Sequence, residues 1–222
     1  MTAINATITP RRAYISADRS SYHVGPGGMP PEDVTAAQKP QVGHRLPDVT
    51  KVRTYNEKRL IATASGSLVL AESAFHWLAE YASDIEHVAL EGPETFSGLL
   101  RESAHETWVR EMIVIVAGYS EARGRVIGYA FDHRQRFEPI TLDRGTTQMP
   151  AASPDMPGYD RLYRQSQQAG KGKRVRAFHE SLHANQIAQF RAGRLRAGGM
   201  ISDAFDMAAV DMHGAHIDRR SR

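Results

Sequence analysis

The 222-residue sequence contains no cysteine, so it has no disulfide, no thiolate nucleophile and no zinc site built on cysteine. It also lacks any apolar run of the roughly 20 residues that a membrane-spanning helix needs. Its first residues do not have the composition of a secretory leader. We therefore expect a cytoplasmic protein that does not enter a membrane, and we expect no cofactor.

Strong charge of one sign is absent as well, because the formal net charge is only +3. The basic residues are nevertheless unevenly placed: residues 161–196 hold nine Lys or Arg, and Glu180 is the single acid among them. This segment has no aromatic interleaving and no recognisable nucleic-acid-binding motif. It is typical of a solvated, arginine-rich helical face, and nucleic acid is not an expected partner.

Short alternating segments indicate strands at the two ends and in the middle of the chain. Four helices are also predicted, the first two of them from apolar residues at helical spacing. The predicted strands are 3–9, 12–18, two strands within 51–65 that join at Asn56 and Glu57, 111–120, 125–132, 137–143, and a closing hairpin over 206–220 that turns at His213 and Gly214. The predicted helices are 67–85, 93–109, 159–168 and 173–193, and the predicted loops are 23–48 and 144–158.

The order of these elements is strands, two helices, strands, two helices, strands. Runs of strands and runs of helices favour antiparallel sheets covered by helices over a parallel α/β sheet. We therefore predict an α+β fold, a four-layer α-β-β-α sandwich of two antiparallel sheets. The length favours one domain, over residues 2–218, with a long inserted loop at 23–48.

Four residues form a candidate catalytic constellation. Thr2 is small enough to permit removal of Met1, after which its own amine is able to take the proton of its hydroxyl. Lys51 would lower the pKa of that amine by charge repulsion, and Asp18 would hold the lysine charged. The backbone N–H of Gly66, at a junction between a strand and a helix, would stabilise an oxyanion. If Met1 is retained, the amine is blocked and this chemistry fails.

Thr2, the stretch ISAD that ends at Asp18, and TKVRTYNEKRLIATASGS followed by a helix resemble the proteasome β-subunit family of N-terminal nucleophile (Ntn) hydrolases. The likeness is closest to the bacterial peptidase that works beneath an ATP-driven unfoldase ring. It implies a threonine-type endopeptidase that forms an acyl-enzyme on Thr2, with Asp18, Lys51 and Gly66 in the roles given above. It also implies self-assembly into a ring or a related homo-oligomer, peptide or unfolded protein as substrate, and an ATP-driven unfoldase as a candidate partner. The residues that the resemblance places at the substrate pocket are Val49, Arg53, Ala64 and Leu68.

The sequence departs from the family pattern at two places, and the second of them favours an alternative function. The loop at 23–48 is longer than the family has between the aspartate and the lysine. The serine-rich glycine turn that supports the nucleophile is absent, and ASPDMPG stands in that region, where Ser153 and Asp155 are the residues able to replace it. The alternative is a catalytically inactive, proteasome-like structural or assembly subunit.

A third hypothesis comes from His179-Glu180-Ser181-Leu182-His183, the H-E-x-x-H pattern of zinc hydrolases on a predicted helix. The two histidines would face one side of that helix, with Glu180 as the base. A zinc hydrolase also needs a third protein ligand. The downstream residues that remain for this role are Asp203, Asp206, His213 and His216. We expect no metal, because a chain with ten histidines readily contains two at this spacing by chance.

Overall fold

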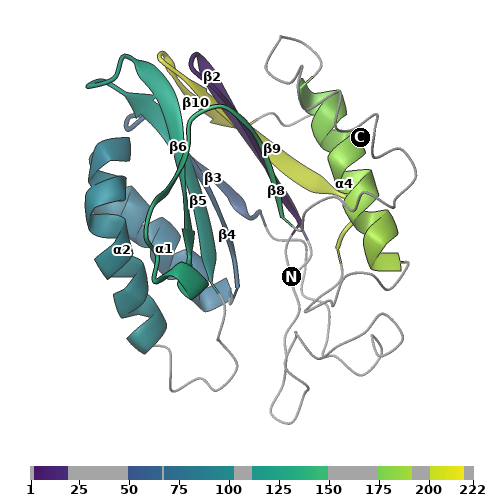
Figure 1. Cartoon of the computed structure of the whole chain (residues 1–222), viewed down its shortest axis with the longest axis horizontal. Coiled ribbons are helices and arrows are strands. Elements are labelled where there is room, and N and C mark those ends of the chain that lie inside the picture. The colour runs from purple at the N-terminus through teal and green to yellow at the C-terminus, as the bar shows by residue number, and fades with distance from the viewer. Residues whose placement is uncertain are drawn as a thin grey trace.

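The computed structural model describes residues 3–19, 50–66, 68–102, 112–149, 175–191 and 201–217. These residues form four layers, with two helices, two antiparallel sheets and a further helix in succession (Figure 1). The predicted α+β sandwich of two antiparallel sheets is confirmed. Within the described residues no helix is both long and apolar enough to cross a membrane.

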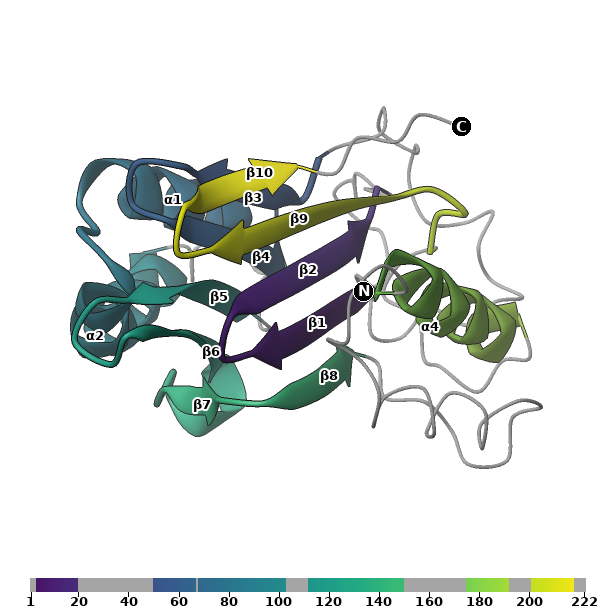
Figure 2. The same ribbon diagram turned by 90° about the horizontal axis from the view of Figure 1, so that it is seen from above.

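The first sheet has the strand order β10-β9-β2-β1-β8, and every neighbouring pair in it is antiparallel (Figure 2). It combines the N-terminal hairpin, the C-terminal hairpin and one strand from the middle of the chain. Its strands are β1 (Ile4–Thr9), β2 (Arg12–Asp18), β8 (Gly145–Met149), β9 (Phe205–Asp211) and β10 (Gly214–Ile217).

The second sheet has the order β3-β4-β5-β6-β7, so strands that follow one another in sequence are neighbours in space. A short 3-10 helix at His133–Gln135 separates β6 from β7. The strands are β3 (Val52–Tyr55), β4 (Leu60–Ser65), β5 (Ile113–Ser120), β6 (Arg125–Asp132) and β7 (Ile140–Leu142).

Alternation along the strands gives each sheet an inner face toward the other sheet and an outer face toward helices. In β1, for example, Ile4, Ala6 and Ile8 lie in the apolar core between the sheets. Asn5 and Thr7 are equally buried, but they face the opposite way and contact the helix α4 (Val175–Arg191). The outer face of the first sheet is therefore polar and is buried beneath α4. Buried faces are usually apolar, because burying a polar group costs free energy unless it is hydrogen-bonded.

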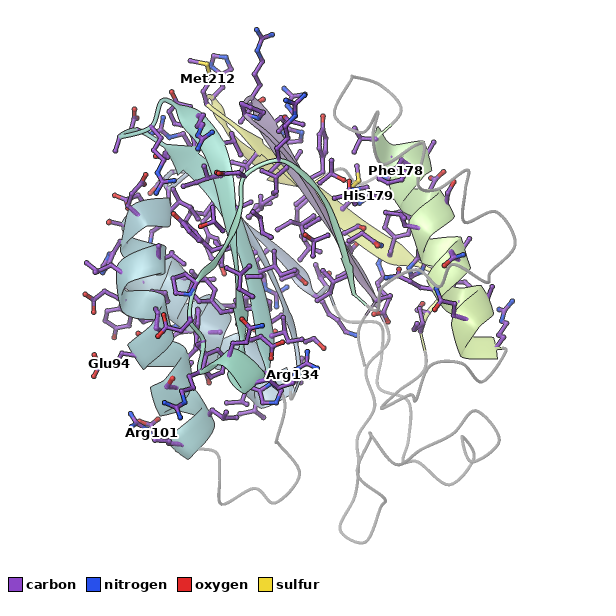
Figure 3. All side chains as sticks on the ribbon, in the orientation of Figure 1. Glu94, Arg101, Arg134, Phe178, His179 and Met212 are labelled. Atoms are coloured by element: carbon purple, nitrogen blue, oxygen red, sulfur yellow. The ribbon has the colours of Figure 1, made fainter. Side chains whose placement is uncertain are left out.

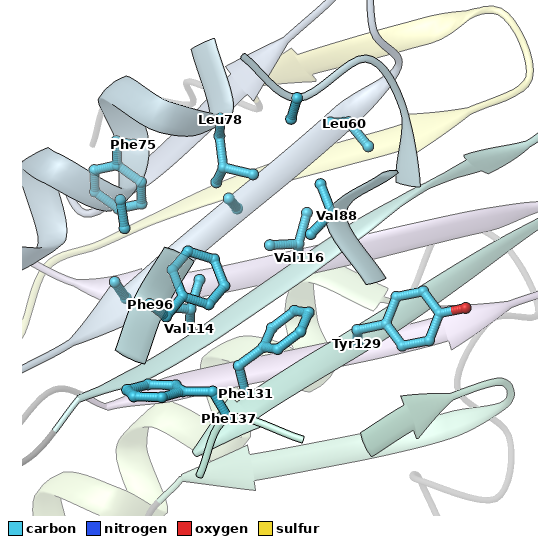
Figure 4. Close-up of a cluster of buried hydrophobic side chains, with 14 of the residues drawn as sticks. Leu60, Phe75, Leu78, Val88, Phe96, Val114, Val116, Tyr129, Phe131 and Phe137 are labelled. Atoms are coloured by element: carbon cyan, nitrogen blue, oxygen red, sulfur yellow. The ribbon is translucent and has the colours of Figure 1, made fainter. Parts of the chain in front are cut away.

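The outer face of the second sheet is apolar and is covered by α1 (Leu68–Glu80) and α2 (Ile85–Glu102). Aromatic rings occupy the centre of this core (Figure 4). Phe96 of α2 meets Phe131 of β6 edge to face, with ring centroids 5.1 Å apart. Burial of such side chains is the main favourable contribution to the free energy of folding.

The predicted bounds of these two helices are wrong. The first helix ends at Glu80 and the second begins at Ile85, so Pro93 lies inside α2 and does not open it. The start is determined by Asp84, whose side chain accepts the backbone N–H of His87 at 2.8 Å as a helix N-cap. A proline in a helix removes one hydrogen bond, and in this chain the packing of α2 on the second sheet outweighs that cost.

The predicted loop over 144–158 is wrong at its start, because Gly145–Met149 form β8 along the free edge of β1. This segment is short and polar, so it has no apolar alternation that would indicate a strand. Its hydrogen-bonding partner, β1, is more than 130 residues away in sequence. The inserted loop 23–48, the helix at 159–168, Ser153 and Asp155 lie outside the described residues, and the single domain over 2–218 stays a prediction.

Candidate active site

Asp18 is the centre of the candidate site, and its side chain is 0% exposed. The β1–β2 register pairs Ile4 with Ala17, which brings Ala3 opposite Asp18. The backbone N–H of Ala3 donates to Asp18 Oδ1 at 2.9 Å, and the backbone N–H of Asp18 donates to the carbonyl of Ala3 at 3.1 Å. Thr2 itself lies outside the described residues, but the hairpin holds its neighbour in the chain against this carboxylate.

Lys51 directly precedes β3 and reaches the same carboxylate from the second sheet. Its Nζ lies 3.5 Å from Asp18 Oδ1, and its side chain is 11% exposed. Burial lowers the pKa of Lys51 from its ordinary value, while the neighbouring Asp18 carboxylate opposes this fall. The structure thus brings together two of the four predicted catalytic residues as a buried pair between two sheets.

Gly66 follows β4 at the same end of the second sheet as Lys51, because Val52 of β3 pairs with Thr63 of β4. Its φ of +127° is a conformation that favours glycine, so the sharp exit from the strand needs this residue. The helix α1 begins two residues later at Leu68. The exposed backbone of Gly66 therefore lies beside a helix N-terminus, where partial positive charge favours an anion.

The residues predicted for the substrate pocket differ in their burial and contacts. Arg53 donates to the carbonyl of Thr50 at 2.7 Å and to Glu72 of α1 at 2.7 Å, so its guanidinium is tied to that helix. Ala64 is buried in the apolar core beneath α1 and α2, and Leu68 is half-buried at the start of α1. Val49 lies outside the described residues. Their roles in substrate binding stay predictions.

The HExxH residues lie on α4, and both histidines of the motif are buried in its interface with the first sheet. Figure 3 shows His179 pointing from α4 toward the first sheet. One ring nitrogen of His179 shares a hydrogen bond of 2.9 Å with Thr7, and the other shares one of 2.8 Å with Ser16. Burial lowers the pKa of His179 to about 3, so the ring is neutral. Both of its metal-binding atoms are thus occupied by hydroxyl groups of the sheet.

The rest of that motif does not converge on His179 either. His183 Nε2 donates to the carbonyl of Ser202 at 2.7 Å, and Glu180 forms an ion pair with Arg176 one turn earlier on α4. Among the residues that the structure describes, no group of three or more His, Cys, Asp or Glu is arranged to hold a metal ion. Asp203, Asp206, His213 and His216 do not supply the third ligand, and these contacts argue against the zinc hydrolase.

One contact to Asp18 was not predicted from the sequence. The backbone N–H of Ser202, three residues before β9, donates to Asp18 Oδ2 at 3.4 Å. Both carboxylate oxygens therefore have donors, and these come from the start of the chain, the start of β3 and the approach to β9. A backbone donor has no signature in the side-chain sequence, so only the pairing of β2 with β9 reveals it.

Two solved structures with a similar fold are those of Anbu (ancestral beta-subunit) proteins. Anbu from Yersinia bercovieri matches with a TM-score of 0.58 and 11% sequence identity, over 100% of this chain and 88% of that chain. A Gly-1 mutant of Anbu from Hyphomicrobium sp. strain MC1 matches with a TM-score of 0.57 and 10% identity, over 99% of this chain and 85% of that chain. No protein-family model and no curated protein matches the chain.

At these identities the likeness shows the fold alone, which is that of the two Anbu structures. The expectation of a closest likeness to the bacterial peptidase beneath an ATP-driven unfoldase is wrong. The two similar structures named above are Anbu proteins, which form a proteasome-like but distinct family. At 10–11% identity, short motifs near the N-terminus do not separate one branch of such a fold from another.

Proposed function

We propose that this chain is a threonine-type Ntn peptidase that cleaves peptide bonds through an acyl-enzyme on Thr2. The observation that carries this proposal is the buried Asp18 carboxylate, which binds the backbone N–H next to Thr2 and the ammonium group of Lys51. Burying a charged pair costs free energy, and the position of this pair beside the backbone N–H that follows Thr2 in the chain is a reason to assign it a chemical role.

The reaction follows from the groups at this end of the sandwich. After removal of Met1, the free amine of Thr2 takes the proton from the Thr2 hydroxyl, and Oγ attacks the peptide carbonyl. The backbone N–H of Gly66 stabilises the oxyanion. The amine then returns the proton to the leaving nitrogen as the C–N bond breaks and an ester remains on Thr2. Water, activated by the same amine, hydrolyses that ester.

Lys51 and Asp18 tune this reaction without touching the substrate. A charged Lys51 near the amine of Thr2 lowers the pKa of that amine, so that more of it is neutral and able to act as a base near pH 7. Asp18 keeps Lys51 charged despite its burial, since the carboxylate raises the pKa of Lys51 against the effect of desolvation. The pair acts as one unit.

The proposal includes a cytoplasmic location, a peptide or unfolded protein as substrate, and self-assembly into a ring or related homo-oligomer that encloses the site. Enclosure is the physical solution to an open peptidase site, because folded proteins then cannot enter. The proteasome-like fold is consistent with assembly. A requirement for an ATP-driven unfoldase rested on the likeness corrected above and is not part of the proposal.

Intact mass spectrometry with a threonine-directed β-lactone or epoxyketone tests the proposal. The expected result is a mass without Met1 and a gain of one inhibitor adduct, which Thr2→Ala abolishes. Thr141→Ala is the matched control, because Thr141 is an exposed threonine on β7 whose loss should leave adduct formation unchanged. Retention of Met1 without an adduct would refute the peptidase and favour the inactive assembly subunit.

A further inference from the structure

The polar interface between α4 and the first sheet contains two buried histidines that the peptidase chemistry does not use. His179 binds side chains of the sheet, whereas His183 binds the backbone of Ser202. We propose that His183 is a positioning residue for the Asp18 carboxylate, which it holds in place through the backbone of Ser202. This inference rests on the proposed function and assigns to α4 a part in it.

A continuous series of hydrogen bonds connects α4 to the chain start. His183 Nε2 donates to the Ser202 carbonyl at 2.7 Å, and the N–H of the same residue donates to Asp18 Oδ2 at 3.4 Å. The other oxygen, Asp18 Oδ1, accepts the N–H of Ala3 at 2.9 Å and lies 3.5 Å from Lys51 Nζ. Orientation of the carboxylate plane thus depends on where Ser202 lies.

Ser202 is fixed from its own side as well. Its hydroxyl accepts the backbone N–H of Ala204 at 3.1 Å, and the carbonyl of Ala204 accepts the backbone N–H of Arg19 at 3.2 Å. Arg19 also forms an ion pair with Asp206 of β9. The approach to β9 is therefore tied to the end of β2, and His183 supplies the hold on it from the helix layer.

His183 is more than a filler of the interface. Its side chain is 3% exposed, and its Nδ1 is buried without a hydrogen-bond partner among the described residues. Since a carbonyl only accepts, Nε2 carries the proton and Nδ1 holds an unsatisfied lone pair. Leucine would fill this space without that cost, so the donor at Nε2 is the property that histidine adds. In His179, by contrast, both nitrogens have partners.

Two substitutions at this position separate the donor from the volume. His183→Leu fills about the same volume with an apolar side chain but removes the donor, and His183→Gln keeps an N–H at about the same reach. His179→Leu is the matched control, since it removes a histidine of the same helix and interface whose hydrogen bonds go to Thr7 and Ser16. If His183→Leu does not fold, His183→Asn replaces it, because its shorter amide does not reach the Ser202 carbonyl.

The first readout is the second-order rate of adduct formation on Thr2, measured per folded molecule by intact mass. We expect His183→Leu to lower this rate at least tenfold, His183→Gln to restore it to within threefold of the parent, and His179→Leu to stay within threefold. Equal losses in His183→Leu and His179→Leu, or no difference between Leu and Gln at position 183, would overturn the proposal.

The second readout does not depend on peptidase activity. The chain has five lysines, so ¹³C,¹⁵N-lysine NMR with Lys51→Arg for assignment follows the Lys51 ammonium directly. The Asp18 carboxylate raises the pKa of Lys51 against the effect of burial, and this contribution weakens when the carboxylate is no longer held beside Lys51. The Lys51 titration should therefore move to lower pH by at least half a unit in His183→Leu but not in His183→Gln. An unchanged titration would refute the positioning role. A shift in a protein that forms no adduct would retain that role and reject the peptidase.

Discussion

Asp18→Asn is the substitution for which the structure gives the sharpest expectation. The carboxylate serves the N–H groups of Ala3 and Ser202 and the ammonium of Lys51, and it is completely buried. An asparagine has one acceptor oxygen and two donor hydrogens, so at least one of these three donors then faces another donor. Lys51 also loses this carboxylate while only 11% of its side chain is exposed.

The magnitude has an upper limit that follows from the lysine. Breaking a buried ion pair by removing one partner costs about 3–5 kcal/mol. The folded protein can escape part of this cost by releasing the proton of Lys51, and at pH 7 that release from the ordinary value of 10.5 costs at most about 5 kcal/mol. We therefore expect the free energy of unfolding to fall by about 3–5 kcal/mol at pH 7.

The pH dependence identifies the cause. In Asp18→Asn the pKa of Lys51 in the folded state falls further below 10.5, so the unfolded chain binds more protons than the folded one in this range. Stability then rises with pH, by up to about 1.4 kcal/mol per unit, and the deficit relative to the parent is smaller at pH 9 than at pH 7. In the parent, Asp18 limits this fall and the slope is lower.

Urea unfolding at pH 7 and pH 9 measures both quantities. Asp18→Asn combined with Lys51→Met removes both charges, and the double variant should be more stable at pH 7 than Asp18→Asn alone, because loss of a whole buried pair is often nearly neutral. The reasoning is refuted if the free energy of unfolding of Asp18→Asn lies within about 1 kcal/mol of the parent value and changes with pH at the same slope.

Two further predictions concern the layers on either side of the site. The neutral His179, with a pKa of about 3, contributes stability that is complete above pH 6.5 and is lost as the pH falls toward 3. Between pH 7.5 and pH 5 His179→Gln should therefore lose about 2 kcal/mol less than the parent in urea unfolding, and equal losses would contradict the assignment. A Cβ added at Gly118 of β5 would lie 2.4 Å from Leu60 Cδ2 and 2.9 Å from the carbonyl of Arg59, so Gly118→Ala should cost about 1–3 kcal/mol by thermal or urea unfolding. Gly98→Ala on α2 is its control, because nothing lies within 4 Å of the new Cβ, and it should be neutral or stabilising by up to about 1 kcal/mol; similar losses in both variants would argue against a close approach at Gly118.

The N-terminal half of the candidate site could be predicted from the sequence because it depends on local spacing. Alternation over residues 3–9 and 12–18 indicates two strands, and the short turn at Pro10 and Arg11 fixes their register. That register alone brings residue 3 beside Asp18. The pairing of Lys51 with Asp18 is predicted as part of the catalytic constellation, but the contact itself depends on the packing of the two sheets, because β2 and β3 lie in different sheets.

Other features depend on which elements meet, and local spacing does not record this. The polar segment at 145–149 becomes a strand only because the edge of β1 is open to it. The HExxH motif by itself predicts metal ligands. In the structure α4 packs on the first sheet, and the hydroxyls of Thr7 and Ser16 form hydrogen bonds with both ring nitrogens of His179. The N–H of Ser202 reaches Asp18 across 184 positions of sequence.

Local sequence is sufficient for the type and the buried faces of most strands and helices, since apolar side chains recur with the period of the element that buries them. It also determined the pairing within the N-terminal hairpin. The partners of the buried polar groups, among them Thr7, Ser16 and His183, depend instead on how the layers pack together. A hydrogen bond joins two particular atoms within about 3 Å, and that distance is set by the packing of whole layers and not by the residues on either side in the chain.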